Sequence, residues 1–186
     1  MGIFLLTIMN ETLILMEEVK KFSMTEQKKD GGNAITWYNQ GVELAQKGSF
    51  AEAVSCFDKA LAVDPKNTNT INTKGLALQR LGRLDEALAC YNQVLAMKPG
   101  ETHALNDKGQ VLHLQGKYRE AVTCYEKSLV IDASTFETWY NKALALVNLG
   151  EMDDAMKSLG QALKISPYHL QAMKLKQVLL RHKGKK

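Results

Sequence analysis

The chain has 186 residues, 45% apolar and 24% charged, which is enough for one domain with a sizeable core or for a short array of repeats. It contains only three prolines and is rich in Ala, Leu, Lys, Gln and Glu, a profile that favours helix. The net charge of +4 arises at the end of the chain, since residues 170–186 hold six Lys or Arg and no acid, and the nearly neutral body argues against a nucleic-acid-binding fold.

Residues 1–33 form an N-terminal extension that differs from the rest of the chain. Its apolar run over residues 3–16 is interrupted by polar residues and is too short to span a bilayer, and it lacks the positive start and cleavage site of a secretory signal. Residues 9–22 could form an amphipathic helix that docks on the first of the repeats described below or on a partner. Alternatively, Met24 is the natural start and the upstream residues are an addition. Contact with a membrane surface is the third interpretation.

Four segments of 34 residues follow, and they align without insertion or deletion over residues 34–67, 68–101, 102–135 and 136–169. Self-similarity of this extent is a much stronger signal than any short motif in the chain. Apolar or small residues at positions 4, 8 and 11 of each repeat form one stripe at helical spacing, and positions 20, 24 and 27 form a second. Each repeat is therefore predicted to be a pair of helices. Position 4 holds the largest residues of the first stripe, Trp37, Ile71, Leu105 and Trp139.

Glycine and proline mark the ends of these helices. Glycine at position 15 is expected at the bend inside each repeat, because the end of the first helix needs backbone angles that are costly for other residues. Proline at position 32 ends the second helix, since it disfavours helix in the residue before it. Repeat 3 has Ala133 at position 32, so we expect a softer boundary there. The glycines and prolines at these positions are Gly48, Gly82, Gly116, Gly150, Pro65, Pro99 and Pro167.

Residues 170–186 are predicted to form a capping helix followed by a basic tail. The helix can cover repeat 4 with Ala172, Leu175 and Leu179, as the end of a solenoid requires. Its basic residues face water; they are Lys174, Lys176 and Arg181. Contact of the tail with RNA or a membrane would predict salt-sensitive binding that is lost when residues 183–186 are deleted.

At these positions the sequence resembles the tetratricopeptide repeat, with the pattern W-x2-L-G-x2-Y, then A-x3-F and a late proline. The resemblance covers residues 34–169, and it implies an all-α fold, a right-handed α-solenoid of antiparallel helix pairs. It also implies a cytoplasmic protein-binding scaffold that is not an enzyme. Position 7, usually leucine in the family, is Gln40, Lys74, Lys108 or Lys142. We expect these lysine stems to cover apolar surface while their ammonium groups lie in water.

The cysteines and histidines do not form a recognisable chemical site. Cys56, Cys90 and Cys124 occupy position 23 of three successive repeats. Packed helices have axes about 8–10 Å apart, whereas a disulfide needs Cα atoms within about 7 Å, so these cysteines are expected to be small apolar residues. The sequence has no C-x2-C pair, no histidine cluster with zinc spacing, and no P-loop or serine elbow. We therefore predict no catalytic residue, no metal site and no cofactor.

The resemblance implies that the first helix of each repeat lines a concave groove through positions 2, 5, 9 and 12. Amide side chains occupy the middle of this row, and aromatic side chains occupy its ends. Asn and Gln can donate to and accept from a peptide backbone at once, which suits an extended protein segment or a helix of a protein partner. The candidate partner-binding residues are Tyr38, Asn72, Gln79, His103, Asn106, Gln110, His113 and Tyr140.

Two further interpretations concern the kind of partner. Some family members clamp the terminal carboxylate of a chaperone tail with cations, but the two corresponding sets here supply none; they are Tyr38, Val42, Thr73, His103 and Asp107, and Asn72, Leu76, Asp107, Glu137 and Asn141. The alternative function is homo-oligomeric self-assembly through the N-terminal helix or an incompletely capped end of the solenoid.

Overall fold

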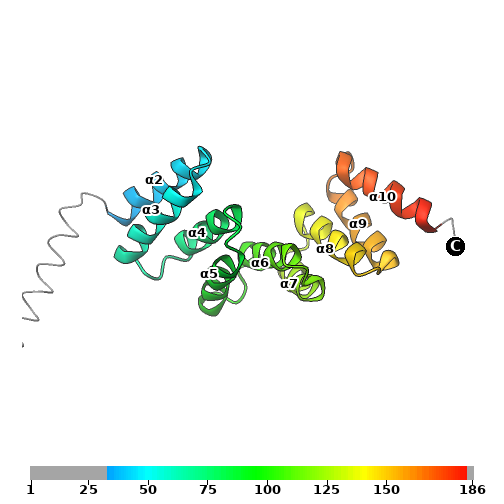
Figure 1. The fold of residues 1–186 in the computed structure, drawn as a ribbon. Helices are drawn as coiled ribbons and strands as arrows, with labels where there is room; N and C mark the ends of the chain where they lie inside the picture. The colour runs from blue at the N-terminus through cyan, green and yellow to red at the C-terminus, as the bar shows by residue number, and fades with distance from the viewer. Residues whose placement is uncertain (1–32, 184–186) are drawn as a thin grey trace, which may run out of the picture.

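The computed structural model describes residues 33–183, which form nine helices and no strand (Figure 1). Even-numbered helices up to α8 are the first helices of the repeats, and odd-numbered helices are the second. The N-terminal helix predicted for residues 9–22, and the start at Met24, lie outside the described residues. The helices are α2 (Ala34–Gln46), α3 (Phe50–Val63), α4 (Thr68–Arg80), α5 (Leu84–Met97), α6 (Thr102–Leu114), α7 (Tyr118–Ile131), α8 (Phe136–Asn148), α9 (Met152–Ile165) and α10 (Leu170–Lys183).

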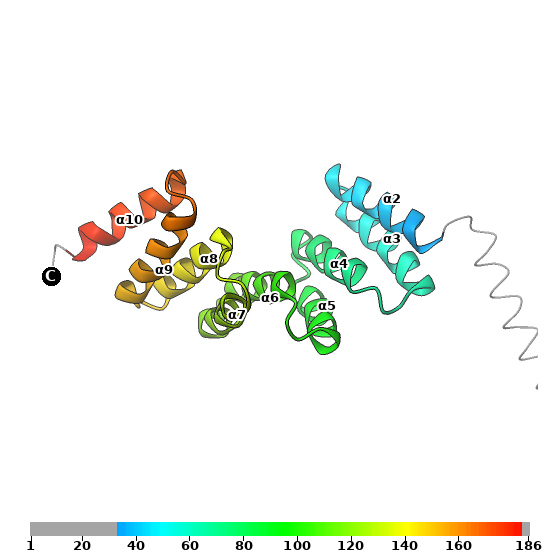
Figure 2. The same cartoon turned by 180° about the vertical axis from the view of Figure 1, so that it is seen from behind.

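The helices form a curved row in which each one packs against the next along the chain. First helices of neighbouring repeats also touch, α2 with α4, α4 with α6 and α6 with α8, so they make up one continuous wall. Figures 1 and 2 show the row from both sides, with α2 and α10 at its two separate ends. The prediction of an all-α solenoid is confirmed.

The core follows the two predicted stripes. Every residue at positions 20, 24 and 27 is buried, from Ala53 in repeat 1 to Ala162 in repeat 4. The buried residues divide into one cluster over α2–α6 and another over α6–α10, so α6 contributes to both. This division agrees with a solenoid in which each repeat is stabilised by its neighbours.

Position 8 shows why these helix pairs approach so closely. A Cβ atom added to Gly41, Gly75 or Gly109 would lie 2.5–2.7 Å from a ring atom of the aromatic residue at position 24. Repeat 4 carries Ala143 at position 8 and Leu159 at position 24 instead, and both are fully buried. A slightly larger residue on one helix is thus matched by a smaller one on the other.

The predicted bends and helix ends are present, with one difference. Glycines at position 15 have φ between 75° and 83°, the left-handed region that other residues avoid. The second helix of repeat 3 ends at Ile131, the same repeat position as in the other repeats, so Ala133 in place of proline does not shift the boundary. The carboxylate of Asp132 accepts a hydrogen bond from the Ser134 N–H at 2.8 Å, and this turn replaces the effect of proline.

Position 4 differs from the prediction where it holds tryptophan. Trp37 and Trp139 are only half-buried, whereas Ile71 and Leu105 belong to the core. The Lys59 ammonium lies 4.2 Å from the centre of the Trp37 ring. The Trp139 Nε1–H donates to the Ala133 carbonyl at 2.9 Å. Both indoles therefore lie at the edge of the core, where their polar partners can reach them.

Repeat-to-repeat packing uses positions that the stripes did not reveal. Positions 3 and 10 of the first helices are buried from repeat 2 onward, as are the equivalent positions of α10, and they carry small or aliphatic residues in every case. These residues are Thr70, Ala77, Ala104, Val111, Thr138, Ala145, Ala172 and Leu179.

The lysines at position 7 are paired, contrary to the expectation that their ammonium groups lie in water. Lys74 Nζ lies 2.6 Å from Asp58 Oδ1, and Lys142 Nζ lies 2.9 Å from Glu126 Oε1. Lys108 Nζ donates to Asn92 Oδ1 at 2.7 Å. Each partner lies at position 25 of the preceding repeat, so the lysines join neighbouring repeats.

Helix α10 has two different faces. Ala172 and Leu179 are buried in the cluster that also contains α9, and Leu175 packs against the same cluster. Lys174, Lys176 and Arg181 are exposed. The remaining apolar residues are 41–59% exposed, because the described residues contain no second helix to cover them; they are Leu170, Met173, Val178 and Leu180.

Candidate peptide-binding groove

Polar side chains on the first helices pair across the repeats and form a row along the wall of α4, α6 and α8. The Asn72 amide donates to Asp107 Oδ2 at 3.2 Å, and the Asn141 amide donates to Asn106 Oδ1 at 3.5 Å. The Asn148 amide lies 2.9 Å from His113 Nε2. Each bond joins residues 35 apart, so the spacing of the repeats sets the geometry of the row.

One pocket lies between α4 and α6 and has a volume of about 340 Å³. Asn72, His103 and Asp107 line it, together with Thr68, Asn69, Lys98 and Glu101. Asn72 Oδ1 is buried and accepts no hydrogen bond from the described residues. Burial raises the pKa of the Asp107 carboxyl above its usual value, and the amide of Asn72 partly opposes this shift. The pocket therefore contains polar atoms that water or a ligand could satisfy.

A second pocket, of about 490 Å³, lies between α6, α8 and the loop before α10. We call it the aromatic pocket, because Phe136, Tyr140 and His169 form one of its walls. The rings of Phe136 and Tyr140 are stacked, with centroids 5.7 Å apart and planes 12° from parallel. The other lining residues are Gln79, Asn106, Gln110, His113, Leu114, Tyr125, Glu137 and Asn141.

Two tyrosines of the second helices differ in whether their buried hydroxyl groups have a hydrogen-bond partner. The Tyr91 hydroxyl donates to Gln79 Oε1 at 3.3 Å. The Tyr125 hydroxyl is buried and has no hydrogen-bond partner among the described residues. Burial raises the pKa of both phenols, so both are protonated at neutral pH. Burial also lowers the pKa of His113, which favours the neutral imidazole.

The candidate residues gather mainly in these two pockets. Asn72 and His103 line the first, whereas Gln79, Asn106, Gln110, His113 and Tyr140 line the aromatic pocket. Tyr38 lines neither; its hydroxyl accepts from the Asn69 amide at 3.0 Å, and its ring packs on Phe57. That these residues bind a partner remains a prediction.

Sequence reasoning missed several residues of the pockets. Phe136 and His169 lie at positions 1 and 34 of repeat 4, the two ends of one repeat, yet their ring centroids are 4.3 Å apart. Asp107 and Asn141 lie at position 6, outside the row of positions 2, 5, 9 and 12 that the resemblance assigns to the groove. Their pairing with position 5 of the preceding repeat, at a separation of 35 residues, is the signal that could have indicated them.

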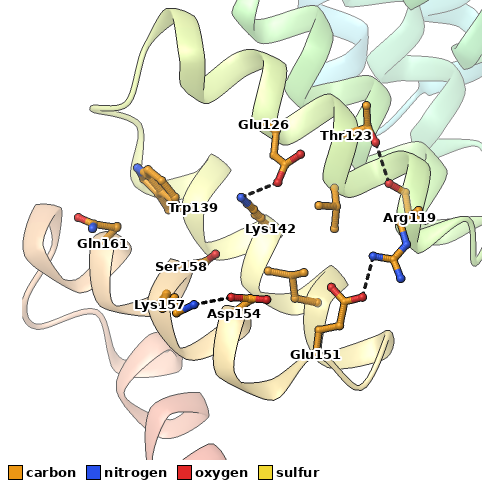
Figure 3. A pocket seen from close by; sticks show the side chains of 12 residues that line it. Arg119, Thr123, Glu126, Trp139, Lys142, Glu151, Asp154, Lys157, Ser158 and Gln161 are labelled. Atoms are coloured by element: carbon orange, nitrogen blue, oxygen red, sulfur yellow. Dashed lines mark hydrogen bonds and ion pairs between the residues drawn. The ribbon is translucent and has the colours of Figure 1, made fainter.

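A third pocket, of about 500 Å³, lies on the other side of the wall, between α7, α8 and α9 (Figure 3). Arg119 pairs with Glu151, Lys142 with Glu126, and Lys157 with Asp154, at 2.6–2.9 Å. Binding a charged ligand there would require these pairs to separate. The groove side offers unsatisfied polar atoms instead and is the better candidate site.

The cysteines are free and buried within the second helices. Burial raises the pKa of the Cys90 and Cys124 thiols, which disfavours the reactive thiolate. In residues 33–183 no three His, Cys, Asp or Glu side chains come together in a way that could hold a metal ion. Within the same residues no helix has the length and apolar character needed to cross a membrane.

Most of the chain matches one protein family. The tetratricopeptide repeat family matches residues 34–67, 67–134 and 101–166. These matches cover more than half of the sequence, and the chain belongs to the tetratricopeptide repeat family. The resemblance inferred from the sequence is thereby confirmed. Comparison with curated proteins gave no significant match.

Solved structures agree with this fold. MamA from Desulfovibrio magneticus RS-1 (residues 41 to the end) superimposes with a TM-score of 0.76 at 19% identity, covering 83% of this chain and 87% of that one. YrrB, a tetratricopeptide repeat protein with an unusual peptide-binding site, gives 0.71 at 22% identity over 90% and 86%. The first repeat domain of Spaghetti (RPAP3), bound to the HSP90 peptide SRMEEVD, gives 0.62 at 16% identity over 63% and 93%.

Proposed function

We propose that the chain is a protein-interaction scaffold that binds an extended segment or a helix of a partner along α4, α6 and α8. The row of amides at Asn72, Asn106 and Asn141, with a pocket on each side, carries this proposal. Amide side chains can pair with both the N–H and the C=O groups of a peptide backbone. Peptide binding by YrrB and by the RPAP3 domain supports the same use of the fold.

The proposal is tested with peptides selected from a random display library on the full-length chain and measured by calorimetry. An Asn72→Ala, Asn106→Ala double variant should bind the selected peptides at least about tenfold more weakly, because two backbone-pairing amides are lost. The control is Gln93→Ala with Gln161→Ala, which removes two exposed amides on second helices. If the control loses binding and the groove variant retains it, the groove is not the site.

The charge of the groove distinguishes its partner from the HSP90 peptide bound by the RPAP3 domain. That peptide, SRMEEVD, is acidic near its end. In this chain the aromatic pocket contains Glu137, and its described lining contains no Lys or Arg. An acidic chain terminus would meet like charge there, so we expect this peptide to bind no better than a scrambled version.

Self-assembly is a second candidate function, and the exposed apolar residues of α10 favour it. Leu170, Met173, Val178 and Leu180 lie on one helix and are each more than 40% exposed. Several exposed apolar side chains on the last helix, next to the cations Lys174 and Arg181, are compatible with a contact surface of mixed character. Light scattering should then report more than one chain for the full-length protein and for the chain starting at Met24, but a single chain for Met173→Glu, Leu180→Glu. A monomeric full-length protein at high concentration would exclude this candidate.

A further inference from the structure

We infer that the aromatic pocket recognises an arginine side chain of the bound segment. The inference rests on the proposed function and adds a chemical specificity to one part of the groove. It depends on three properties of the pocket: its flat aromatic wall, its charge and its unpaired hydroxyl.

The wall consists of three flat rings that line the pocket and contact one another. Phe136 and Tyr140 are stacked side by side, and His169 lies 4.3 Å from Phe136 and 5.7 Å from Tyr140. Guanidinium groups stack on aromatic faces through cation–π attraction and are more weakly hydrated than ammonium groups, so they leave water more readily. The wall therefore favours arginine over lysine.

The charge of the pocket favours a cation over an anion. Glu137 is exposed at the rim, and the described residues include no Lys or Arg within ion-pairing distance of it. Asn106, Gln79 and Gln110 add neutral amides. A carboxylate or phosphate entering the pocket would meet Glu137 without a compensating cation, whereas a guanidinium could form a charge-assisted hydrogen bond with it.

The unpaired hydroxyl of Tyr125 favours a ligand with many hydrogen-bond donors. An unsatisfied buried oxygen carries a free-energy cost that a donor from a ligand would remove. A guanidinium has five N–H donors, so it could serve Glu137 and a second oxygen of the pocket together. An apolar side chain would fill the same space and leave these oxygens unpaired.

The pocket is also placed to receive a side chain from a segment lying in the groove. Asn106 belongs both to the amide row and to the lining of the pocket. A segment whose backbone pairs with Asn106 would run past the mouth of the pocket, so one of its side chains could enter while the backbone stays in the row.

The test uses the full-length chain and four small probes: N-acetyl-arginine-N-methylamide and its citrulline, lysine and glutamate counterparts. Binding is followed by NMR of the Phe136, Tyr140 and His169 ring signals. The arginine probe should shift these signals saturably and bind about tenfold more tightly than citrulline, which has the same shape but no charge. Equal affinities for arginine and citrulline would overturn the inference.

Two matched variants test whether the arginine probe binds in the aromatic pocket. Glu137→Gln should weaken the arginine probe about five- to tenfold and leave citrulline unchanged. Glu101→Gln makes the same charge change in the other pocket and should leave both probes unchanged. If the two variants weaken the arginine probe equally, the interaction is only with the overall charge of the groove, and the inference fails. Tyr125→Phe should lower the arginine affinity further without changing the ring-signal positions of the free protein.

The display-selected peptides separate this inference from the proposed function. If they require Asn72 and Asn106 but show no enriched arginine, the groove function stands and the arginine pocket is wrong. If they carry an arginine whose replacement by citrulline costs affinity in the wild type and not in Glu137→Gln, both are supported. If no peptide is selected, the proposed function fails and the inference fails with it.

Discussion

Gly41, Gly75 and Gly109 have no room for a side chain, because an aromatic ring of the paired helix lies against each of them. In repeat 4 the same contact is made by Ala143 and Leu159. The two residues at this contact lie 16 positions apart and together fill a fixed volume. A larger side chain at one position therefore requires a smaller side chain at the other.

Gly109→Ala should destabilise the chain by about 1–3 kcal/mol, because the new Cβ would lie 2.5 Å from Tyr125 Cε1. Adding Tyr125→Leu should recover part of this loss, since the pair then matches that of repeat 4. The control is Gly160→Ala, where nothing lies within 4 Å and the higher helix propensity of Ala should be neutral or stabilising. Urea unfolding measures all three, and equal losses for Gly109→Ala and Gly160→Ala would contradict the contact.

Leu112→Ala should cost about 2–5 kcal/mol, because the side chain is only 4% exposed and its removal leaves a cavity. Leu114, two residues later, is 63% exposed, so Leu114→Ala should change stability by less than about 0.5 kcal/mol. A loss under about 0.5 kcal/mol at Leu112 would mean that position 11 is not core.

His113 should make the chain sensitive to mild acid. Burial lowers its pKa in the folded state below the usual value of 6.5, so the unfolded state binds the proton more readily. The contribution of neutral His113 is fully present above this usual value and is lost as the pH falls towards the folded-state pKa. Between about pH 7.5 and pH 5.5 the wild type should therefore lose more unfolding free energy than His113→Gln. Parallel losses in both proteins would exclude His113 as the source.

At the scale of the helix, the lysines at position 7 connect neighbouring repeats through ion pairs or a hydrogen bond. The Lys142 side chain is 17% exposed, and its partner Glu126 is 54% exposed. A pair of this kind, held by helices that already touch, loses less side-chain freedom than a pair on a free surface. These links should therefore contribute more than the pairs within single helices.

A double-mutant cycle of Lys142→Met and Glu126→Gln should give a coupling of about 0.2–1 kcal/mol that weakens as salt is added. The comparison cycle is Lys157→Met with Asp154→Asn, whose side chains are 78% and 59% exposed. Its coupling should be smaller. A larger coupling in α9 than between α7 and α8 would show that the link does not join the repeats energetically.

The sequence predicted those features that depend on one repeat, and it missed those that depend on how repeats stack. The helix pairs, the buried stripes and the glycine bends follow from local periodicity and from backbone angles. Positions 3 and 10 were missed because Thr70 and Ala77 give little apolar signal. The Lys142–Glu126 link was missed because its spacing of 16 residues crosses from one repeat to the next.

In the candidate groove, too, the features of single repeats could be predicted and the contacts between segments could not. The resemblance to the family was enough to propose Asn72, Asn106 and Tyr140 on one wall. It did not indicate that Phe136 and His169 meet beside Tyr140, because this contact depends on how the loop after α9 returns to the start of α8. Nor did it indicate that Asn72 Oδ1 remains unsatisfied, since this depends on how the Asn72 amide pairs with Asp107, 35 residues away.

On the scale of the whole solenoid, the contacts within residues 33–183 reach only from each helix to its near neighbours. Deleting residues 170–186 removes Ala172 and Leu179 from the second core cluster. Backbone amides of α8 and α9 should then exchange hydrogen faster, while those of α2–α5 stay unchanged, because terminal repeats of a solenoid can open locally. Deleting only residues 184–186 is the control. Faster exchange throughout the chain would show a single cooperative unit instead.

Positions 3 and 10, which pack one repeat on the next, differ between the two ends of the solenoid. This difference determines at which end the array can be lengthened by protein engineering. On α2 these positions are Thr36 and Glu43, both exposed, and Glu43 is paired with Lys47 on its own helix. A repeat fused before α2 would have to bury that carboxylate. On α10 the equivalent residues already form a buried junction, and the opposite side carries exposed apolar residues next to Lys174 and Arg181. A designed helix fused after α10 could therefore extend the row without any change to the existing repeats.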